Sequence, residues 1–523
     1  MNRRQEISRC MSSEGSSKVF MPRFLPVREQ RLGRSAVLSL LTIVLVLGAV
    51  LIAVSRHRLV DYDEGFYLLA AKSVLHGKLL YRDFFYTQMP LLPYVYGLWM
   101  RIMGETWESG RLLSALCATV IGCLLFRHVS QVAGSLLAGG CSVLMFVSNT
   151  YVLGWYPIAK TYSLSVLLLF AAYLILWRVS NRTGLFAGGL LLALSIDTRL
   201  FLVATMPVFV MCIYARRKFL PPLATCYAWF VLGIAAGLLP NLIWAVSAPA
   251  AYLFNNLGYH AVRTDAGLVG SLHQKIVMLL KISGLIGTAE GSGIPFGLLI
   301  LSNALYLVLQ PNARWPSVWP AMGLAAAIIG VSTLPTPTYQ QYYCAAVPFL
   351  IVGAVTFAWE IGRSRKYVIV LSCALIAYLL PVPFELPRYL SSGTGIISVV
   401  TEANAVNWRL HSVREVSRQI DRVTAPGEEV FSRWPGDLLE SHATAVVGTE
   451  NDFGLLIAHR LSANQLRTYG ILSESAIEAD FEHHHPRVVI LTADREPFEE
   501  SLQRNGYRPV YRLGQTVIYA FGP

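Results

Sequence analysis

The sequence predicts a polytopic α-helical membrane protein of about eleven spans, followed by a small C-terminal α/β domain. Hydrophobic residues make up 54% of the 523 residues and charged residues only 14%, whereas soluble domains carry about 25% charged residues. The apolar residues form long runs, and a run of about 20 such residues crosses a bilayer as a helix. Beyond residue 382 the sequence becomes charged and alternating, as in a soluble domain.

Eleven runs are predicted to be spans, and the first is longer than a signal-peptide core, so we interpret it as a retained anchor. The short runs 184–197 and 200–215 have an alternative interpretation, a helical hairpin that does not fully cross. Lys275 and Lys281 interrupt segment 272–289, which predicts an interfacial helix instead of a span. The predicted spans lie near 35–56, 109–126, 134–151, 159–177, 184–197, 200–215, 223–247, 293–310, 316–334, 343–361 and 367–382.

Basic residues set the predicted orientation in a cytoplasmic (inner) membrane. The net charge of +12 is explained by the positive-inside rule better than by nucleic-acid binding. Residues 1–34 form a basic tail, expected to be cytoplasmic, before the transmembrane domain 35–382. Every later loop predicted to be internal is basic as well, at Arg127, Arg178 and Arg182, Arg216 to Lys218, Arg314, and Arg363 to Lys366. The alternation then places the long loop 57–108 and the domain 383–523 on the same outer face.

The domain 383–523 shows short segments with strand and helix patterns. We expect it to cap the outer face. Strands are predicted at 428–434 and 487–491, helices at 453–461, 474–481 and 497–505, and a hairpin at 507–513 and 515–521 around Gly514.

Asp63 and Glu64 lie just beyond the first span, in the outer loop. A carboxylate there is desolvated on one side and reachable by head groups and water-soluble molecules on the other, which suits a general base. The alternative is a solvated acidic loop; for Asp61 we favour a solvated or helix-capping role over a site role.

Two amphipathic stretches follow, 66–77 and 91–103, and predict interfacial helices able to hold a lipid-linked substrate beside the carboxylate.

The loop carries a wider pattern around these acids. Its other parts are Tyr67, Ala70 and Ala71, Gly77, Tyr81, Pro90 and Arg111. Together with the acids it resembles the membrane glycosyltransferases of the C-type fold. The resemblance is to the group that includes the protein O-mannosyltransferases, the aminoarabinose transferase of lipid A and the rhizobial lipopolysaccharide-core transferases. It covers the first loop best, then the span count, and the tail only in outline.

The resemblance implies a chemistry. Such enzymes transfer a sugar from a polyprenyl-phosphate donor to a hydroxyl on a lipid, glycan or protein acceptor at the outer face. Asp63 corresponds to the proposed general base of an inverting displacement, with Glu64 in support. Two departures weaken other parts of the pattern. Glutamine replaces the usual arginine in segment 339–343, and the stretch 155–160 carries Lys160 where relatives often have a further carboxylate, so a metal-bridged mechanism lacks support.

The departing lipid phosphate needs cationic or hydrogen-bonding partners. Alternatives are a simple turn pairing of Asp197 with Arg199, and head-group contact or snorkelling for the residues of loop 248–275. The substrate-binding candidates are Asp61, Tyr67, Lys160, Arg199, Tyr259, His260, Arg263 and Tyr342.

Three further points bound the function. A transporter or flippase of lipid-linked or polar substrates is the main alternative, but no repeated halves or mid-span ionisable residues favour it; a non-catalytic scaffold is a third interpretation. The lack of a glycine-rich nucleotide fingerprint favours a lipid-linked donor. No cofactor is indicated with certainty: a divalent metal is compatible with the sequence but unsupported, and the His483 to His485 run fits a solvated turn better than a metal site.

Overall fold

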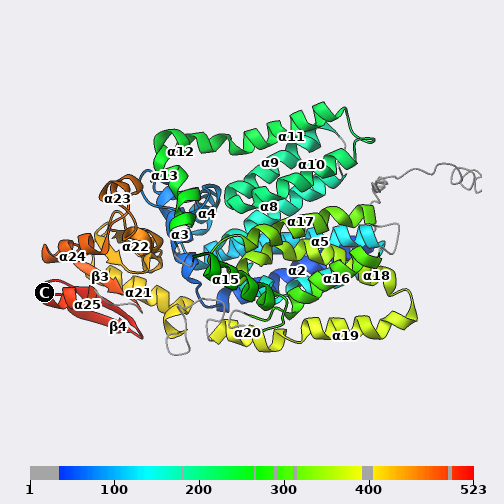
Figure 1. Cartoon of the computed structure of the whole chain (residues 1–523). Coiled ribbons are helices and arrows are strands. Elements are labelled where there is room, and N and C mark those ends of the chain that lie inside the picture. Colours follow the sequence, from blue (N-terminus) through cyan, green and yellow to red (C-terminus); the bar gives the residue numbers. More distant parts are fainter. Residues whose placement is uncertain are drawn as a thin grey trace, which may run out of the picture.

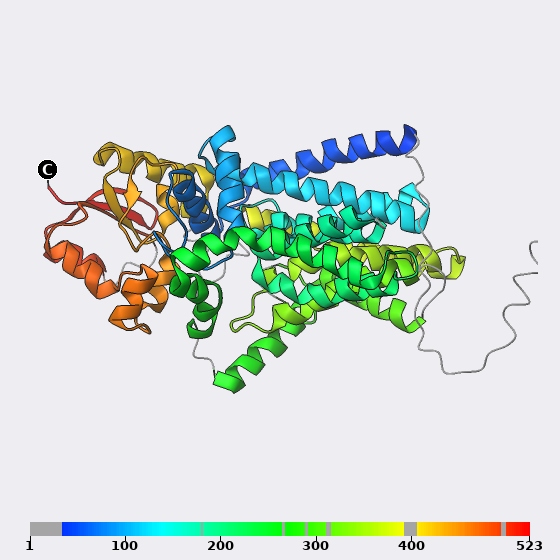
Figure 2. The ribbon, with the colours of Figure 1, turned by 90° about the horizontal axis from the view of Figure 1, so that it is seen from above.

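The computed structural model describes residues 34–178, 181–263, 267–287, 291–309, 315–391, 405–492 and 498–522. Its helices form one elongated bundle, and the C-terminal α/β domain lies at one end of that bundle (Figure 1). The turned view shows the same arrangement, with α2 (Arg34–His57) lying alongside α5 (Trp107–Ala133) (Figure 2). The predicted basic tail lies almost wholly outside the described residues, as does the predicted inner-loop residue Arg314.

Each of the eleven predicted runs is largely helical, although some, such as 223–247, comprise more than one helical element. Six helical segments are long and apolar enough to cross a membrane: Ala36–His57, Trp107–Ala133, Thr161–Arg178, Leu223–Ser247, Gln340–Ile361 and Arg365–Leu390. The chain is therefore a multi-pass membrane protein, and the number of helices that cross stays a prediction. The remaining helices of the bundle are α6 (Leu136–Val147), α9 (Arg182–Thr198), η1 (Leu200–Thr205) with α10 (Met206–Ala215), α16 (Ile294–Leu309) and α17 (Trp315–Thr333).

The surface of the bundle is apolar where it would meet lipid. Leu45 and Val46 on α2 are 72% and 60% exposed, and Ile369 on α19 (Val368–Leu379) is 75% exposed. The interior is apolar too. Apolar side chains of α5, α8 (Thr161–Arg178) and α18 (Val347–Ile361) pack together in one buried core. Helices that are apolar on both sides are typical of a protein whose solvent is hydrocarbon.

The first loop, which the charge pattern predicts to be outer, forms two helices. Helix α3 (Tyr62–Leu75) is capped by Asp61, and it packs on α4 (Leu91–Met103). Segment 272–289 lies mostly in α15 (Gly267–Ile282), which begins earlier than predicted and is not among the helices that meet the criteria for a span. The loop 248–263 is helical too: α13 (Pro249–Leu253), the π-turn η3 (Phe254–Gly258) and α14 (Tyr259–Val262).

A five-stranded sheet in the order β2-β1-β3-β5-β4 forms the C-terminal domain, so the predicted α/β character is confirmed. Strands β1, β2 and β3 are parallel, and the hairpin β4–β5 joins β3 in antiparallel fashion. Sequence analysis missed β2, α21 and α23. The strands are β1 (Glu429–Ser432), β2 (Thr444–Ala445), β3 (Val488–Leu491), β4 (Arg508–Leu513) and β5 (Thr516–Ala520); the helices are α21 (Leu410–Val423), α22 (Asp452–Ala458), α23 (Ala463–Tyr469), α24 (Glu474–Glu482) and α25 (Phe498–Arg504).

The C-terminal domain is fixed directly on helix α3. The ammonium of Lys72 donates to the backbone carbonyls of Leu438, Leu439 and Ser441 at 3.1, 3.0 and 2.7 Å. The indole N–H of Trp434 donates to the carbonyl of Tyr62 at 2.9 Å. These contacts hold the domain against the helix whose first turn carries Asp63.

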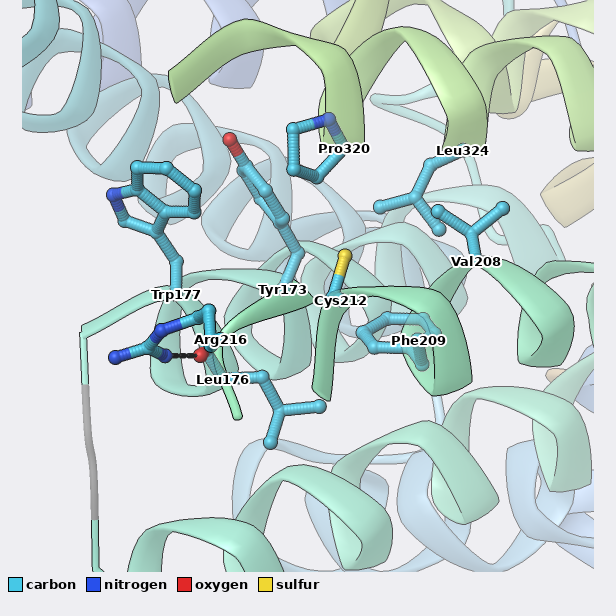
Figure 3. Close-up of a pocket in the computed structure, with 9 residues that line it drawn as sticks. All are labelled: Tyr173, Leu176, Trp177, Val208, Phe209, Cys212, Arg216, Pro320 and Leu324. Atoms are coloured by element: carbon cyan, nitrogen blue, oxygen red, sulfur yellow. Dashed lines mark hydrogen bonds between the residues drawn. The ribbon is translucent and has the colours of Figure 1, made fainter. Parts of the chain in front are cut away.

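A small apolar pocket lies within the bundle, away from this junction. Side chains of α8, α10 and α17 surround it, among them Tyr173, Phe209 and Leu324, and Arg216 donates to the carbonyl of Leu176 beside it (Figure 3). Its volume is about 10 Å³, which is near the minimum for one water molecule. We therefore interpret it as a packing gap in the core.

Candidate active site

A cavity of about 980 Å³ lies where the start of α3 meets the C-terminal domain. Nine of the ten residues that the sequence predicted for the site line it. They are Asp61, Asp63, Tyr67, Lys160, Arg199, Tyr259, His260, Arg263 and Tyr342. These residues come from five separate stretches of the chain, and the fold brings them together although Asp61 and Tyr342 are 281 positions apart in the sequence.

Two carboxylates share one ammonium at the start of α3. Lys160 places its Nζ 2.8 Å from Asp61 Oδ1 and 2.8 Å from Asp63 Oδ2. The same Nζ donates to Gln341 Oε1 at 2.8 Å, so the glutamine that replaces the arginine expected from the resemblance has a partner here. Asp61 also accepts the backbone N–H of Asp63 at 3.1 Å and so caps the helix, which agrees with the capping interpretation.

Asp63 is the more open of the two carboxylates. Its side chain is 24% exposed, against 4% for Asp61 and 3% for Lys160. Burial raises the pKa of Asp63, and the attraction of Lys160 only partly opposes that rise. For Lys160, burial lowers the pKa, but attraction by Asp61 and Asp63 outweighs it and the pKa lies well above its usual value. The result is a carboxylate with a raised pKa at the cavity wall beside an ammonium whose charged form is favoured.

Glu64 is placed differently from the prediction of a catalytic role. Its side chain is fully buried and is absent from the cavity wall; it pairs with Arg111 at 2.6 and 2.8 Å. It also accepts the backbone N–H of Ala159 at 2.9 Å and that of Asp61 at 2.8 Å. With its oxygens occupied in this way, Glu64 holds the start of α3 against α5 and against the segment before α8. These contacts suit a positioning role beside Asp63.

Arg199 follows α9 and lies within a cage of aromatic rings. Its guanidinium carbon is 4.3 Å from the ring centroid of Tyr162 and 4.4 Å from that of Phe201. It donates to Thr161 Oγ1 at 2.5 Å, and its Nε is buried without a hydrogen-bond partner. Asp197 instead accepts from Asn241 at 2.8 Å, so the alternative of a simple Asp197–Arg199 turn pair does not match the structure.

Arg263 lines the cavity and contacts the loop 334–342, which lines it too. Its Nη2 donates to the carbonyl of Pro337 at 2.9 Å and to the hydroxyl of Tyr342 at 3.4 Å, and its Nε is buried without a partner. Tyr259 is buried and packs beside Phe85, with ring centroids 6.0 Å apart. Tyr67 is buried too, and burial raises its pKa above the usual value for a phenol.

Sequence analysis missed the residues that the C-terminal domain contributes to the cavity. Arg433 and Thr492 come directly after strands β1 and β3. Ligands of open α/β sheets bind outside the carboxyl ends of parallel strands. By this rule the predicted strand 487–491 could have indicated Thr492, whereas the predicted strand 428–434 extended past Arg433. The other contributions from this domain are Trp408, Trp434, Phe453, Leu456, Ile457 and Gln515.

Positive charge exceeds negative charge along the cavity wall. Lys160, Arg199, Arg263 and Arg433 face two carboxylates, those of Asp61 and Asp63. Such an excess suits an anionic ligand, since arginine binds phosphate through paired hydrogen bonds. Within the described part of the chain, no group of three His, Cys, Asp or Glu side chains is arranged to hold a metal ion.

Comparison with known proteins gives likenesses of structure alone. No protein-family model matches the chain, and no curated protein matches it. Among solved structures, ArnT from Cupriavidus metallidurans bound to undecaprenyl phosphate is similar with a TM-score of 0.62 and 12% identity, over 93% of this chain and 98% of that one. The apo state of the same protein gives a TM-score of 0.61 with the same identity and coverage.

A third similar structure is the archaeal oligosaccharyltransferase AglB from Archaeoglobus fulgidus, at a TM-score of 0.47 and 11% identity over 93% of this chain and 75% of that one. The likeness to ArnT extends over nearly the whole of both chains. At 12% identity it establishes a shared fold.

Proposed function

We propose that this chain, which has the fold of the C-type membrane glycosyltransferases, transfers a sugar from a polyprenyl-phosphate donor to a hydroxyl of a lipid, glycan or protein. One observation carries the proposal: the partly exposed carboxylate of Asp63 lies in a large cavity whose wall has an excess of positive charge. The solved structure of ArnT holds undecaprenyl phosphate, which supports the same class of donor here.

Asp63 is the proposed general base. It accepts the proton of the acceptor hydroxyl while the hydroxyl oxygen forms a bond to the anomeric carbon of the donor. The bond from that carbon to the phosphate oxygen breaks, and its electron pair leaves with the phosphate. A single displacement of this kind inverts the anomeric configuration. The raised pKa of Asp63, caused by burial, strengthens it as a base.

Arg199 and Arg263 are the proposed partners of the departing phosphate. Each has a buried Nε–H without a protein acceptor, and each lies on the cavity wall. A guanidinium fixed by rings or by backbone contacts does not need to reorganise as negative charge grows on the leaving oxygen. The prenyl chain has a matching apolar exit, because Leu257 and Leu334 line the cavity and are 60% and 70% exposed.

Substitution of Asp63 by asparagine tests the proposal. In purified protein, transfer from a panel of polyprenyl-phosphate sugars should fall by about 10²- to 10⁴-fold, the usual contribution of a general base. Undecaprenyl phosphate should still bind, since the arginines are unchanged. Asp83→Asn, at a carboxylate of the same loop that pairs with the exposed Arg82, is the matched control. Unchanged transfer by Asp63→Asn would reject the base and favour the transporter or flippase alternative.

The proposal also assigns the cavity and the C-terminal domain to the outer face of the cytoplasmic membrane. The basic loops predicted to be internal support that orientation. Protease added to intact spheroplasts should release the C-terminal domain, and a cytoplasmic marker protein should stay uncut. Cleavage of the domain only after the membrane is permeabilised would contradict the orientation and leave the chemistry of Asp63 untouched.

A further inference from the structure

One end of the C-terminal sheet, where β1 and β3 have their carboxyl ends, lies at the cavity. Arg433 follows β1, Thr492 follows the parallel neighbour β3, and Gln515 lies in the β4–β5 turn. The register pairs Leu491 at the end of β3 with Val517 at the start of β5, so all three positions share this end of the sheet. All three line the cavity. The carboxyl end of parallel strands is the usual ligand-binding end of an open α/β sheet.

The backbone around Arg433 is fixed from both sides. Its N–H donates to the carbonyl of Ile490 at 2.9 Å, and this bond extends the pairing of β1 with β3. The next residue, Trp434, is stacked on Trp107 with ring centroids 5.7 Å apart and is hydrogen-bonded to the carbonyl of Tyr62. The backbone of Arg433 is therefore held in place, as a preorganised binding residue requires.

The guanidinium of Arg433, in contrast, forms no ion pair with any residue of the described part of the chain. Its Nη1 is buried without a hydrogen-bond partner among the described residues. Asp452 lies in its electrostatic field, but that carboxylate accepts the hydroxyl of Tyr62. Burying an unpaired cationic N–H is costly. The described residues therefore leave Arg433 Nη1 available for an anionic ligand in the cavity.

The surroundings of Arg433 fit a saccharide. The cavity wall beside it carries the rings of Trp408, Trp434 and Phe453, together with the hydrogen-bonding side chains of Thr492 and Gln515. Flat apolar faces next to a few polar groups suit a sugar ring, which has both kinds of surface. At about 980 Å³ the cavity is at the upper end of the range for ligand sites, as expected if two substrates occupy it together.

We infer that this end of the sheet binds the acceptor, and that Arg433 binds an anionic group, a carboxylate or a phosphate, on an acceptor saccharide. That the bound saccharide is the acceptor rests on the proposed glycosyl transfer. The binding itself can be measured without turnover. The donor phosphate is assigned to Arg199 and Arg263, which belong to the membrane domain, so the two anions are bound by different parts of the chain.

The test measures binding to the purified full chain with undecaprenyl phosphate present in excess, so that the donor cations are occupied. The probes are methyl glucoside, methyl glucuronide and methyl glucoside 6-phosphate, which differ only at carbon six. The wild type should bind at least one anionic probe about 10- to 100-fold more tightly than the neutral one, the range for a charged hydrogen bond. The preferred probe identifies the carboxylate or the phosphate as the group recognised.

Arg433→Gln should abolish this preference, and Arg433→Lys should keep part of it because the charge remains without the paired geometry. Arg418→Gln, at an exposed arginine of the same domain, should behave like the wild type. Three results would overturn the inference: no preference in the wild type, an unchanged preference in Arg433→Gln, or weaker binding of undecaprenyl phosphate by Arg433→Gln. Failure of Asp63→Asn to lose transfer would reject the proposed reaction and leave this binding result intact.

Discussion

The ammonium of Lys160 lies 2.8 Å from Asp63 and equally 2.8 Å from Asp61. One cation therefore balances two carboxylates that have different positions. Asp61 is closed off and caps α3, whereas Asp63 keeps 24% of its side chain exposed. The arrangement leaves the carboxylate of Asp63 accessible, and the neighbouring ammonium of Lys160 favours its ionised form.

Loss of the Lys160 charge should shift the pH dependence of transfer. Burial raises the pKa of Asp63 and Lys160 lowers it, so Lys160→Met removes the opposing effect and the pKa rises further. Because the base acts in its ionised form, the acidic limb of the pH profile of kcat/KM should move to higher pH. Profiles of wild type and Lys160→Met measure this directly. Lys78→Gln, at a lysine that pairs with Glu450 outside the cavity wall, should leave the limb in place; a shift to lower pH in Lys160→Met would contradict the assignment.

The membrane fold was predictable because hydrocarbon imposes a simple pattern. Each predicted run is largely helical, since backbone groups in a bilayer must be bonded within their own segment. The two helices of the first loop were predicted as well, although α3 is buried from Glu64 to Ala71 and its interfacial position stays a prediction. The sheet of the tail followed from its short apolar strands.

The roles of adjacent acids were less predictable. Asp63 and Glu64 are neighbours in sequence, but successive residues on a helix point about 100° apart, and only the packed structure shows that Glu64 turns to Arg111. The contribution of the C-terminal domain depends on contacts such as the hydrogen bond between Tyr62 and Asp452, which are 390 positions apart. No local pattern encodes a contact of that separation.

The buried Glu64–Arg111 pair should be essential for stability. Both side chains are at most 1% exposed, and removal of one partner of such a pair leaves an uncompensated buried charge at a cost of about 3–5 kcal/mol. Glu64→Gln should therefore lower the free energy of unfolding by about that amount, as measured by denaturation of the purified protein. Glu105→Gln, which removes a partly exposed partner of His76, should change it little. A near-neutral effect of Glu64→Gln would show that other groups compensate for Arg111.

Gly65 is expected to control how closely the C-terminal domain meets α3. A Cβ at this position would lie 2.8 Å from the indole of Trp434 and 3.0 Å from the backbone of Gly436. Gly65→Ala should therefore separate the domain from the helix and destabilise the protein by about 1–3 kcal/mol, as overpacking does. Gly140→Ala, in helix α6 with open space around the added Cβ, should be neutral or slightly stabilising. Thermal unfolding of the two variants compares them, and equal midpoints would refute the close contact.

Asp437 should make the stability of the C-terminal domain depend on pH. Its side chain is only 3% exposed and accepts a hydrogen bond from Ser432 Oγ at 3.0 Å. Burial raises its pKa to about 7, and the bond from Ser432 opposes only part of that rise. The usual pKa of an unfolded aspartate is about 3.9, so the folded state binds the proton more tightly. This contribution to stability is fully present below about pH 3.9 and is lost as the pH rises through the folded value.

Asp437→Asn should remove this loss, because the amide oxygen still accepts from Ser432 and carries no charge to desolvate. The variant should gain stability relative to the wild type as the pH rises, and the gap at about pH 8 should exceed the gap at about pH 5 by about 2–3 kcal/mol. Denaturant unfolding of both proteins at the two pH values measures the gap. Asp480→Asn, at a half-buried carboxylate of α24, controls for the loss of a negative charge in the same domain. An equal gap at both pH values would mean that Asp437 is ionised in the folded domain throughout this range, with its buried charge compensated by the surrounding dipoles.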